Sequence, residues 1–213
     1  MDRDEMPEAL EWDARYTGDG DGAPMWSGQP NGALVAEVAD LVPGTALDVG
    51  CGEGADTIWL ARQGWKVTAV DPSRVALDRA RAAAHKADVE VTWVHSGLLA
   101  MPDGTGVHDL VSAQYPVLRR TVDHAAITAL LGAVAAGGTL LLVHHELDAD
   151  HATQHGFDPA EHVMPGDVTV QLDDRWVVEL HGTRPRLGPL PRDARHTRDV
   201  IVRARRLTGA DDV

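Results

Sequence analysis

The chain has 213 residues, of which 44% are hydrophobic, so it is long enough to form one α/β domain with a buried core. Lys and Arg number 19 against 33 Asp and Glu, which gives a formal net charge of -14. This balance argues against the basic surface with which nucleic-acid-binding proteins neutralise phosphates, so we expect no nucleic-acid partner.

Cysteine usage and the N-terminus indicate where the protein works. Cys51 is the one cysteine, so no internal disulfide can form and a reducing compartment is expected. Residues 1–16 are acidic and lack the apolar stretch of a signal peptide. No apolar run approaches the length that a bilayer requires. We therefore expect a cytoplasmic protein with no membrane partner.

The first part of the chain is predicted to be a helix followed by a loop. The stretch "MPEALEWDARY" has helical spacing, with Leu10, Trp12 and Tyr16 as apolar anchors. Residues 17–32 form a Gly-rich loop that carries Trp26. A second helix, "ALVAEVADLV", follows and ends at a Pro-Gly pair.

Strand and helix patterns then alternate along the chain. This alternation indicates a parallel, doubly wound sheet with helices on both faces. The predicted strands are 45–50, 65–71, 89–95, 107–115 and 137–145, and the predicted helices are 54–64, 73–87 and 123–135.

The end of the chain has a different pattern. Runs 175–186 and 197–207 both read as strands with no full helix between them, which predicts an antiparallel pair at one sheet edge. Residues 147–174 are expected to be loops with one short helix. The predicted fold is therefore a Rossmann-like, mostly parallel sheet of seven strands, the last one antiparallel. Residues 1–32 would be an N-terminal helix and lid loop on a ligand-binding domain of residues 33–213, within one structural domain overall.

Three glycines follow the first predicted strand in the stretch "DVGCGEG". Gly50, Gly52 and Gly54 allow the backbone to approach a ligand, and they tolerate positive φ angles. In open α/β sheets, ligands bind beyond the carboxyl ends of the strands, where this loop lies. Asp71 ends the second strand, at a position from which a carboxylate can accept hydrogen bonds from both hydroxyls of a ribose.

The charges around this loop disfavour a dinucleotide. A dinucleotide fingerprint reads G-x-G-x-x-G, whereas the spacing here is G-x-G-x-G. Asp48 and Glu53 would repel a pyrophosphate and suit a cationic ligand better. A nicotinamide-dependent oxidoreductase is therefore a distant alternative.

The stretches "LDVGCGEG" and "VTAVDPS" resemble motifs I and II of the class I S-adenosylmethionine-dependent methyltransferases. The resemblance implies S-adenosyl-L-methionine as cofactor, with the glycine backbone and Asp48 at its methionine part and Asp71 at its ribose. Ser96 stands where the family often has an acid for the adenine, so the backbone of Gly97 and Leu98 is expected to substitute. The implied cofactor-binding residues are Asp48, Gly50, Gly52, Gly54, Asp71, Pro72, Ser73, Gly97, Leu98 and Gln114.

A narrower resemblance covers both ends of the chain. The patterns "W-D-x-R-Y … W-S-G-x-P-N" and "H-x-x-D-V-I-V-R-A-R-R" are similar to small bacterial methyltransferases of the tellurite-resistance and thiopurine-methyltransferase type. In that group the N-terminal segment is a lid, which implies that Trp12, Tyr16, Trp26 and Asn31 line or close the site. The alternative is that these aromatic residues only pack the helix on the sheet.

The methyl acceptor is expected beyond the fourth and fifth strands. The fourth ends "SAQYP", which places Gln114 and Tyr115 where the family has its acceptor contacts. The fifth ends "HHE", and strand alternation points His144 and His145 to opposite faces. One of the two is therefore the candidate catalytic base, since histidine is a competent base at neutral pH. The alternative for that histidine is a structural role in packing.

The segment after these histidines is rich in acids and further histidines. It runs from Glu146 to His151, with His155 and His162 later, and such side chains suit divalent metal ions. The spacing matches no metal motif, so a solvated acidic loop is the preferred interpretation and a metal cofactor is possible without support from a motif.

The sequence thus leaves several functions open. The first is methylation of a hydroxyl on a small polar molecule, such as a sugar or another metabolite, with a histidine base. The second is methylation of sulfur, selenium or a metalloid, as in the tellurite and thiopurine group. The third, of a different class, is a non-catalytic S-adenosylmethionine-binding protein. The expected assembly is a monomer or a homodimer.

Overall fold

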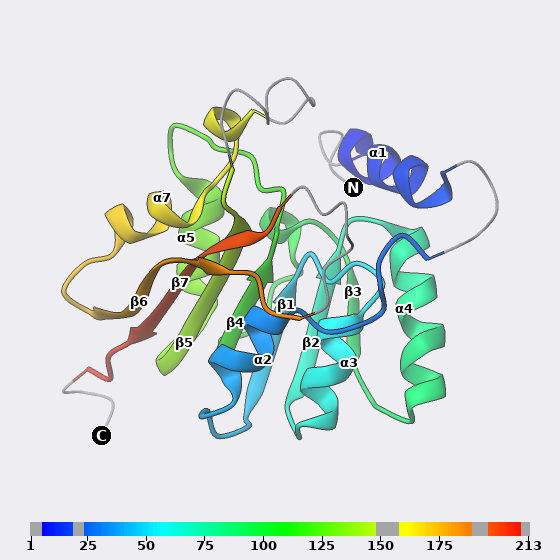
Figure 1. Ribbon diagram of the computed structural model, residues 1–213, viewed down its shortest axis with the longest axis horizontal. Coiled ribbons are helices and arrows are strands. Elements are labelled where there is room, and N and C mark those ends of the chain that lie inside the picture. The colour runs from blue at the N-terminus through cyan, green and yellow to red at the C-terminus, as the bar shows by residue number, and fades with distance from the viewer. Residues whose placement is uncertain (1–5, 19–23, 148–157, 189–195, 210–213) are drawn as a thin grey trace.

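The computed structural model describes residues 6–18, 24–147, 158–188 and 196–209, and Figure 1 draws their arrangement. A seven-stranded sheet in the order β3-β2-β1-β4-β5-β7-β6 runs through the molecule. The strands are β1 Thr45–Val49, β2 Lys66–Asp71, β3 Thr92–His95, β4 His108–Gln114, β5 Val134–His145, β6 Trp176–Pro185 and β7 Arg198–Arg206.

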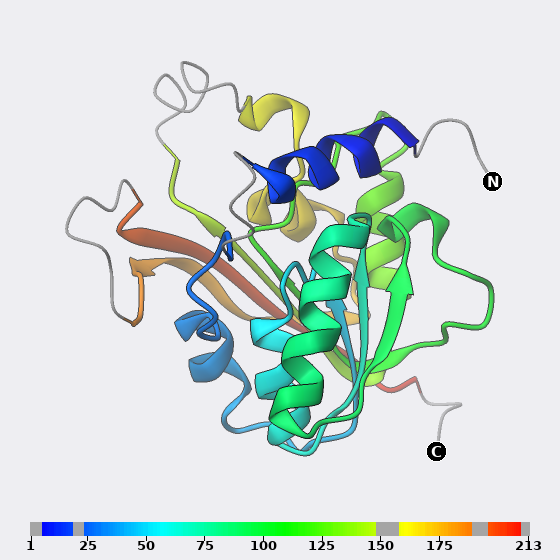
Figure 2. The ribbon, with the colours of Figure 1, turned by 90° about the vertical axis from the view of Figure 1, so that its right-hand side faces the viewer.

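Helices cover both faces of this sheet, as the ribbon shows (Figure 1). One face carries α2 Gly32–Val38, α3 Ala55–Arg62 and α4 Arg74–Ala87, and the other carries α5 Ala125–Gly132 and α7 Pro165–Gln171. Helix α1, Met6–Thr17, lies across one end of the sheet beside α4 (Figure 2). Short 3-10 turns occupy Leu98–Ala100 and Pro159–Glu161.

Alternation of side chains along the central strands creates one apolar layer on each face. In β5, Leu140 and Leu142 pack in the cluster that includes α5 and α7, whereas Leu141 and Val143 pack in the cluster that includes α2 and α3. All four side chains are fully buried. A central strand that is apolar on both faces is typical of a doubly wound sheet.

The predicted fold class is confirmed. Strands β1 to β5 pair in parallel, and β7 pairs antiparallel with both β5 and β6. The last strand of the chain is therefore the antiparallel one, inserted between β5 and the edge strand β6. The carboxyl ends of the parallel strands and the start of β7 meet at the same edge of the sheet.

One local prediction needs correction. The helix expected over residues 123–135 ends at Gly132, because β5 already begins at Val134. The pairing of β4 with β5 shifts between His108 and Leu110, and Gly137 lies in the bulge with φ 80°. Small apolar residues before this bulge suit a helix and a strand equally, so their spacing misled the prediction. Within 147–174, the described part forms one 3-10 turn and the short helix α7; residues 148–157 lie outside the described residues.

Candidate functional site

The loop between β1 and α3 has a backbone that few side chains tolerate. Gly50, Gly52 and Gly54 have φ angles of 71°, 52° and 83°, all in the left-handed region. A Cβ atom on Gly54 would lie 2.9 Å from the Cβ of Ala80 in α4, so close packing also requires a glycine there. A Cβ on Gly50 would meet nothing within 4 Å, so the backbone faces open space at this point. The loop therefore leaves room for a ligand against Gly50.

Asp71 ties the glycine loop to the start of α4. It ends β2, is 5% exposed, and accepts hydrogen bonds from the backbone nitrogens of Gly52 and Ser73, both at 2.8 Å. Burial raises the pKa of this carboxyl, while the two backbone hydrogen bonds oppose the rise. A carboxylate has about four acceptor positions, so two hydroxyl donors from a ligand can still be accommodated.

Two further acids, Asp48 of β1 and Asp56 of α3, are buried behind the loop. The hydroxyl of Thr57 donates to Asp48 at 2.5 Å, and Asn31 donates to Asp56 through its backbone nitrogen and its side-chain amide, both at 2.7 Å. Burial raises the pKa of both carboxyls, and the charge of Asp56 raises that of Asp48 further. These described partners are neutral, so a cationic ligand group would be favoured nearby. Asn31 itself anchors the start of α2 to α3.

The ends of β2 and β3 form the neighbouring wall. Ser73 caps α4, as predicted, by accepting a hydrogen bond from the nitrogen of Ala76 at 3.1 Å. The carbonyl of Pro72 lies 2.9 Å from His95 Nε2. Gly97 precedes the 3-10 turn, and Leu98 is 8% exposed and packs in the core. These residues lie beside Asp71, at the ends of β2 and β3. The resemblance implies that the methionine part of the cofactor lies on the other side of Asp71, toward β1.

Helix α1 is fixed over this edge by specific contacts. Asp13 accepts hydrogen bonds from the hydroxyl of Ser73 at 2.6 Å and from the nitrogen of Val75 at 3.1 Å. Tyr16 is 6% exposed, and its hydroxyl accepts a hydrogen bond from Trp26 Nε1 at 3.1 Å. That hydroxyl lies against Gly52, where a Cβ would approach it to 2.8 Å. Burial raises the pKa of Tyr16 to about 12, so the phenol is neutral.

Glu53 connects the loop before α2 to this arrangement. Its carboxylate accepts hydrogen bonds from the backbone nitrogens of Met25 and Trp26 at 3.1 and 3.0 Å, and pairs with Arg79 of α4 at 2.7 Å. Arg79 also donates to the carbonyl of Tyr16 at 3.0 Å. The Trp26 side chain remains 55% exposed. Glu53 is therefore an anchor for the N-terminal segment, a role that its sequence position did not indicate.

Trp12 lies further along α1. Its ring centroid is 6.1 Å from that of Tyr16, and the guanidinium of Arg15 lies 4.8 Å from its ring centroid. It is half-buried and makes its described ring contacts within its own helix. Of the four residues predicted for the lid, Tyr16 and Trp26 thus have side chains that reach the glycine loop, because a Cβ on Gly52 would lie 2.8 Å from the Tyr16 hydroxyl and 3.6 Å from Trp26 Nε1.

Polar groups also gather at the ends of β4 and β5. Gln114 is 9% exposed and donates through Nε2 to Ser112 at 3.0 Å. Its Oε1 is buried and, among the described residues, has no hydrogen-bond partner, so a donor on a ligand would satisfy it. Tyr115 follows with φ 53°, an unusual backbone conformation for a residue with a side chain.

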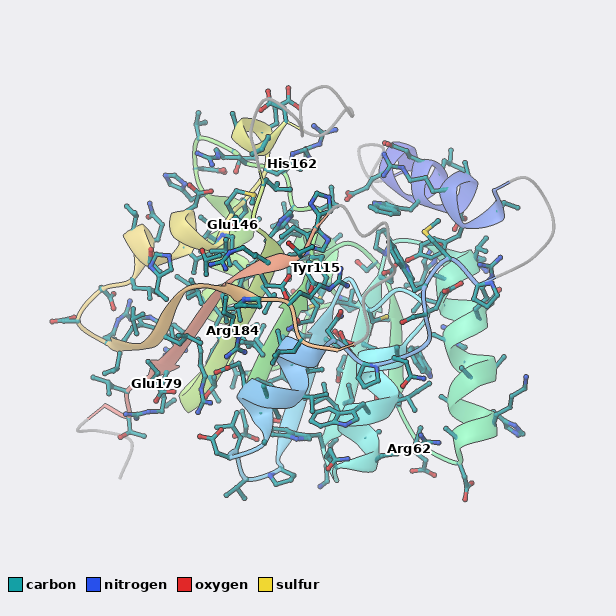
Figure 3. The ribbon with its side chains drawn as sticks, in the orientation of Figure 1. Arg62, Tyr115, Glu146, His162, Glu179 and Arg184 are labelled. Atoms are coloured by element: carbon teal, nitrogen blue, oxygen red, sulfur yellow. The ribbon has the colours of Figure 1, made fainter. Side chains whose placement is uncertain are left out.

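Tyr115 and His145 are packed together at the centre of this edge, where Figure 3 labels Tyr115. Their ring centroids are 4.1 Å apart and stacked, and the ring of His196 stacks on His145 at 4.4 Å. Asp199 of β7 is 1% exposed; its Oδ1 accepts a hydrogen bond from the Tyr115 hydroxyl at 3.1 Å and lies 3.6 Å from His145 Nδ1. The guanidinium of Arg186 lies 5.1 Å from the Tyr115 ring centroid.

His144 lies elsewhere, as the alternation of β5 requires. It is 5% exposed, and burial lowers its pKa to about 4, so the imidazole is neutral near pH 7. Its Nδ1 lies 3.4 Å from the carbonyl oxygen of His145. Tyr115, His145 and Asp199 therefore form one cluster, and the His144 ring, 6.0 Å from that of His145 and nearly perpendicular to it, lies outside that cluster.

Comparison with known proteins identifies the part of the chain that contains the glycine loop. Residues 46–138, which include this loop, Asp71 and the end of β4, match a family model described as a methyltransferase domain. Residues 46–138 are therefore a methyltransferase domain. The predicted family and its cofactor, S-adenosylmethionine, are confirmed at the level of this domain.

A curated protein and a solved structure are also similar to this chain. An uncharacterized methyltransferase of Mycobacterium tuberculosis is 32% identical over 111 residues, which are 52% of this chain and 55% of that protein. The chain thus spans about half the length of this curated relative. A solved structure described as "Conversion of a Disulfide Bond into a Thioacetal Group during Echinomycin Biosynthesis" aligns over 95% of this chain and 94% of its own, with TM-score 0.73 and 23% identity.

The narrower resemblance to the tellurite-resistance group holds for the fold. The structure of TehB from Haemophilus influenzae aligns over 91% of this chain and 66% of its own, with TM-score 0.57 and 13% identity. At this identity the likeness concerns the methyltransferase fold and leaves the acceptor open.

No group of three or more potential metal ligands occurs among the described residues. Glu146 pairs with Arg198 at 2.8 Å, and His162 Nδ1 lies 2.8 Å from the carbonyl oxygen of Asp158. The predicted members Asp148, Asp150, His151 and His155 lie outside the described residues. Across the part of the chain that is described, no helix combines the length and apolar character needed to cross a membrane.

The sequence did not predict the contacts of three residues, Asp13, Glu53 and Asp199. Each makes these contacts with residues far away in the chain, so its place in a local pattern did not indicate its role. One hint for Asp199 was present, because this acid directly precedes the apolar run 200–202 in "RDVIV". A buried charge at such a place usually has a partner or a task.

Proposed function

We propose that the protein is an S-adenosylmethionine-dependent methyltransferase that methylates a hydroxyl group of a small polar molecule, with His145 as the general base. The observation that carries this proposal is the pairing of two features at one edge of the sheet. One is the left-handed glycine loop with Asp71 at its side, and the other is His145 beside a buried carboxylate.

The cofactor end is supported by charge and space. S-adenosylmethionine carries a ribose, an ammonium and a positive sulfonium. Asp71 would accept the ribose hydroxyls, since its carboxylate keeps free acceptor positions beside two backbone hydrogen bonds. The backbone at Gly50 would face the methionine part, with buried Asp48 behind it and Gln114 Oε1 available to the ammonium.

The adenine would lie along the far wall of the same edge. Pro72 and Ser73 would flank the adenosine, and the backbone of Gly97 and Leu98 would contact the base. Tyr16, on the inner face of α1, would cover the cofactor over Gly52. In this proposal α1 and its loop are a lid, and Asp13 and Glu53 hold that lid closed.

Methyl transfer is an in-line displacement, so most of the rate enhancement comes from holding the acceptor about 3 Å from the methyl carbon. A hydroxyl acceptor must also lose its proton as the carbon–oxygen bond forms. A positioned histidine contributes typically 10²–10⁴-fold to such a step. His145 suits this role better than His144, whose burial lowers its pKa to about 4 and leaves it a weak base.

The test is a transfer assay with the purified protein and S-adenosylmethionine carrying a labelled methyl group. The acceptor panel contains catechol, simple phenols and polyols, the thiols dithiothreitol and thiophenol, and selenite and tellurite. We expect turnover of a hydroxyl acceptor, loss of 10²–10⁴-fold in His145→Ala, and a change of at most a few-fold in His144→Gln. S-adenosylhomocysteine should bind in calorimetry and NAD should not.

Each other outcome identifies a different function. Turnover of thiols, selenite or tellurite alone, at equal rates in His145→Ala and wild type, would assign the acceptor to sulfur, selenium or a metalloid, because soft nucleophiles need little help from a base. Tight binding of S-adenosylhomocysteine with no turnover of any panel member would favour the non-catalytic binding protein. A preference for NAD would overturn the proposal at the cofactor itself.

A further inference from the structure

Asp199 is a buried acid at the start of β7, and its carboxylate is aimed at the imidazole that the proposed function uses. We propose that Asp199 is a positioning residue: it fixes the tautomer and the ring orientation of His145, so that Nε2 is the atom that receives the acceptor's proton. This inference rests on the proposed function and extends it to a residue 54 positions away in the chain.

Sheet pairing brings the two side chains together. His145 of β5 and Asp199 of β7 are direct partners in the antiparallel register, so their side chains point to the same face. Asp199 Oδ1 lies 3.6 Å from His145 Nδ1, within ion-pair reach but longer than a hydrogen bond. His145 Nδ1 is buried and has no hydrogen-bond partner among the described residues. Catalytic hydrogen bonds are often long before the substrate is bound and tighten in the complex.

The neighbouring rings restrict the imidazole to small movements. His145 stacks on Tyr115 with an interplanar angle of 25° and on His196 with 11°, which fixes the plane of its ring. Two orientations remain possible in that plane, related by a flip of the ring. A carboxylate at Nδ1 selects the orientation in which Nδ1 donates and Nε2 keeps its lone pair.

The burial of Asp199 is not explained by pairing with a basic side chain. Asp199 is 1% exposed, and none of the described lysines or arginines has a nitrogen within 4.0 Å of its carboxylate. Its partner in β6 is Arg184, whose guanidinium instead pairs with Glu37 at 2.6 Å. A buried carboxylate without a lysine or arginine partner destabilises a fold, so its presence here points to a task at the site.

Tyr115 holds the carboxylate in place from the other side. Its hydroxyl donates to the same Oδ1 at 3.1 Å, and its left-handed backbone, with φ 53°, turns the side chain toward β7. Backbone strain of this kind gathers at functional sites. Burial and the charge of Asp199 raise the pKa of the Tyr115 phenol far above neutrality, so it donates a hydrogen bond and is no base. The proton-accepting role is therefore left to His145.

The proton and electron balance of the step is complete without another reactant. The acceptor oxygen forms a bond to the methyl carbon as the carbon–sulfur bond breaks. The electron pair of the broken carbon–sulfur bond stays on the sulfur of S-adenosylhomocysteine. The hydroxyl proton passes to His145 Nε2, and the imidazolium is stabilised by the carboxylate of Asp199. The proton then leaves to water, which restores the neutral imidazole.

The test uses Asp199→Asn in the full chain, with Glu179→Gln as the matched control, because Glu179 is a carboxylate of the same sheet that pairs with Arg203 and Arg205 at its surface. With a hydroxyl acceptor, we expect kcat of Asp199→Asn to fall at least 10-fold, by less than in His145→Ala. Affinity for S-adenosylhomocysteine should change less than 2-fold, and Glu179→Gln should match wild type. Thermal unfolding checks that the variant is folded.

One further readout separates positioning from a merely structural role. The groups that face His145 are Tyr115 after β4, His144 from β5, Asp199 from β7 and His196 before β7, and Asp199 is the acid among them. Nitrogen-15 spectra of the labelled imidazoles, in the free protein and with S-adenosylhomocysteine, should show the Nδ1–H tautomer of His145 in wild type and a mixture of tautomers in Asp199→Asn.

The inference is overturned if Asp199→Asn keeps the wild-type rate, or if His145 has the same tautomer in both proteins. It is also overturned if the variant loses rate equally on thiol acceptors, since those need no base. Failure of the proposed function is distinguishable: His145→Ala would then keep its activity, and the tautomer spectra would still decide whether Asp199 orients the ring.

Discussion

Replacement of Asp71 by asparagine tests the cofactor site most directly, because the shape of the side chain is kept while its charge and one of its two acceptor oxygens are lost. Each carboxylate oxygen already accepts one backbone hydrogen bond at 2.8 Å, from Gly52 and from Ser73. A ribose would add hydrogen bonds to the same charged group. Such bonds stabilise a complex by about 1.5–3 kcal/mol when one partner is charged and about 0.5–1.5 kcal/mol when both are neutral.

The difference of about 1–1.5 kcal/mol predicts a rise of roughly 5- to 13-fold in the Kd of S-adenosylhomocysteine for Asp71→Asn. Asp71→Ala loses the whole interaction, so a rise of roughly 13- to 160-fold is expected. The alanine variant also leaves two buried backbone N–H groups without their acceptor, which should lower the free energy of unfolding by about 1–3 kcal/mol.

Isothermal titration calorimetry with S-adenosylhomocysteine measures these changes, and adenosine as a second ligand locates them at the ribose. Asp78→Asn is the matched control, because Asp78 is an exposed acid of α4 that pairs with Arg81 at 3.1 Å. Its affinity should equal that of wild type. If both Asp71 variants are folded and bind S-adenosylhomocysteine as tightly as wild type, Asp71 does not contact the cofactor and the assignment of the glycine loop is wrong.

Three more predictions follow from the described contacts. Hydrogen exchange in residues 6–18 should slow when S-adenosylhomocysteine binds, and Asp13→Ala should make this exchange faster in the free protein. Equal exchange with and without S-adenosylhomocysteine, and in the variant, would show that α1 is a fixed element and no lid. Gly50→Ala adds a Cβ where no atom lies within 4 Å, so calorimetry should show loss of cofactor binding, and chemical denaturation should show only about 1–2 kcal/mol of destabilisation from the positive φ. Burial and the charge of Asp56 raise the pKa of Asp48 above its unfolded value, so this group stabilises the free protein at low pH and that contribution is lost as pH rises through the folded pKa. Urea unfolding between about pH 5 and pH 8 should show this loss in wild type and a flatter profile in Asp48→Asn, and parallel profiles would contradict it.

Local sequence patterns predicted the geometry of the glycine loop and its surroundings well. The spacing of the three glycines, the acid that ends β2 and the cap at Ser73 all depend on residues close together in the chain, and the structure has each of them in the expected element. Periodicity failed at the end of α5, because the small apolar residues around Val134 satisfy a helix and a strand alike.

The acceptor side was less predictable for a physical reason. The sequence indicated that one histidine of β5 faces the site, since alternation separates His144 from His145. It did not indicate which one, because that depends on the strand that pairs with β5 from the far end of the chain. The role of Asp199 arises from that pairing alone, and residues that meet only through sheet order leave no short-range signature.

The insertion of β7 between β5 and β6 has a consequence for biosynthesis. Strands β1, β2 and β4, with the helices around them, come from the first 132 residues, so the groups of the proposed cofactor pocket are synthesised early. The proposed acceptor side is complete only once Arg198–Arg206, which pairs between β5 and β6, has been synthesised. A nascent chain at that stage has the groups that would hold the methyl donor and lacks the carboxylate that would orient the base.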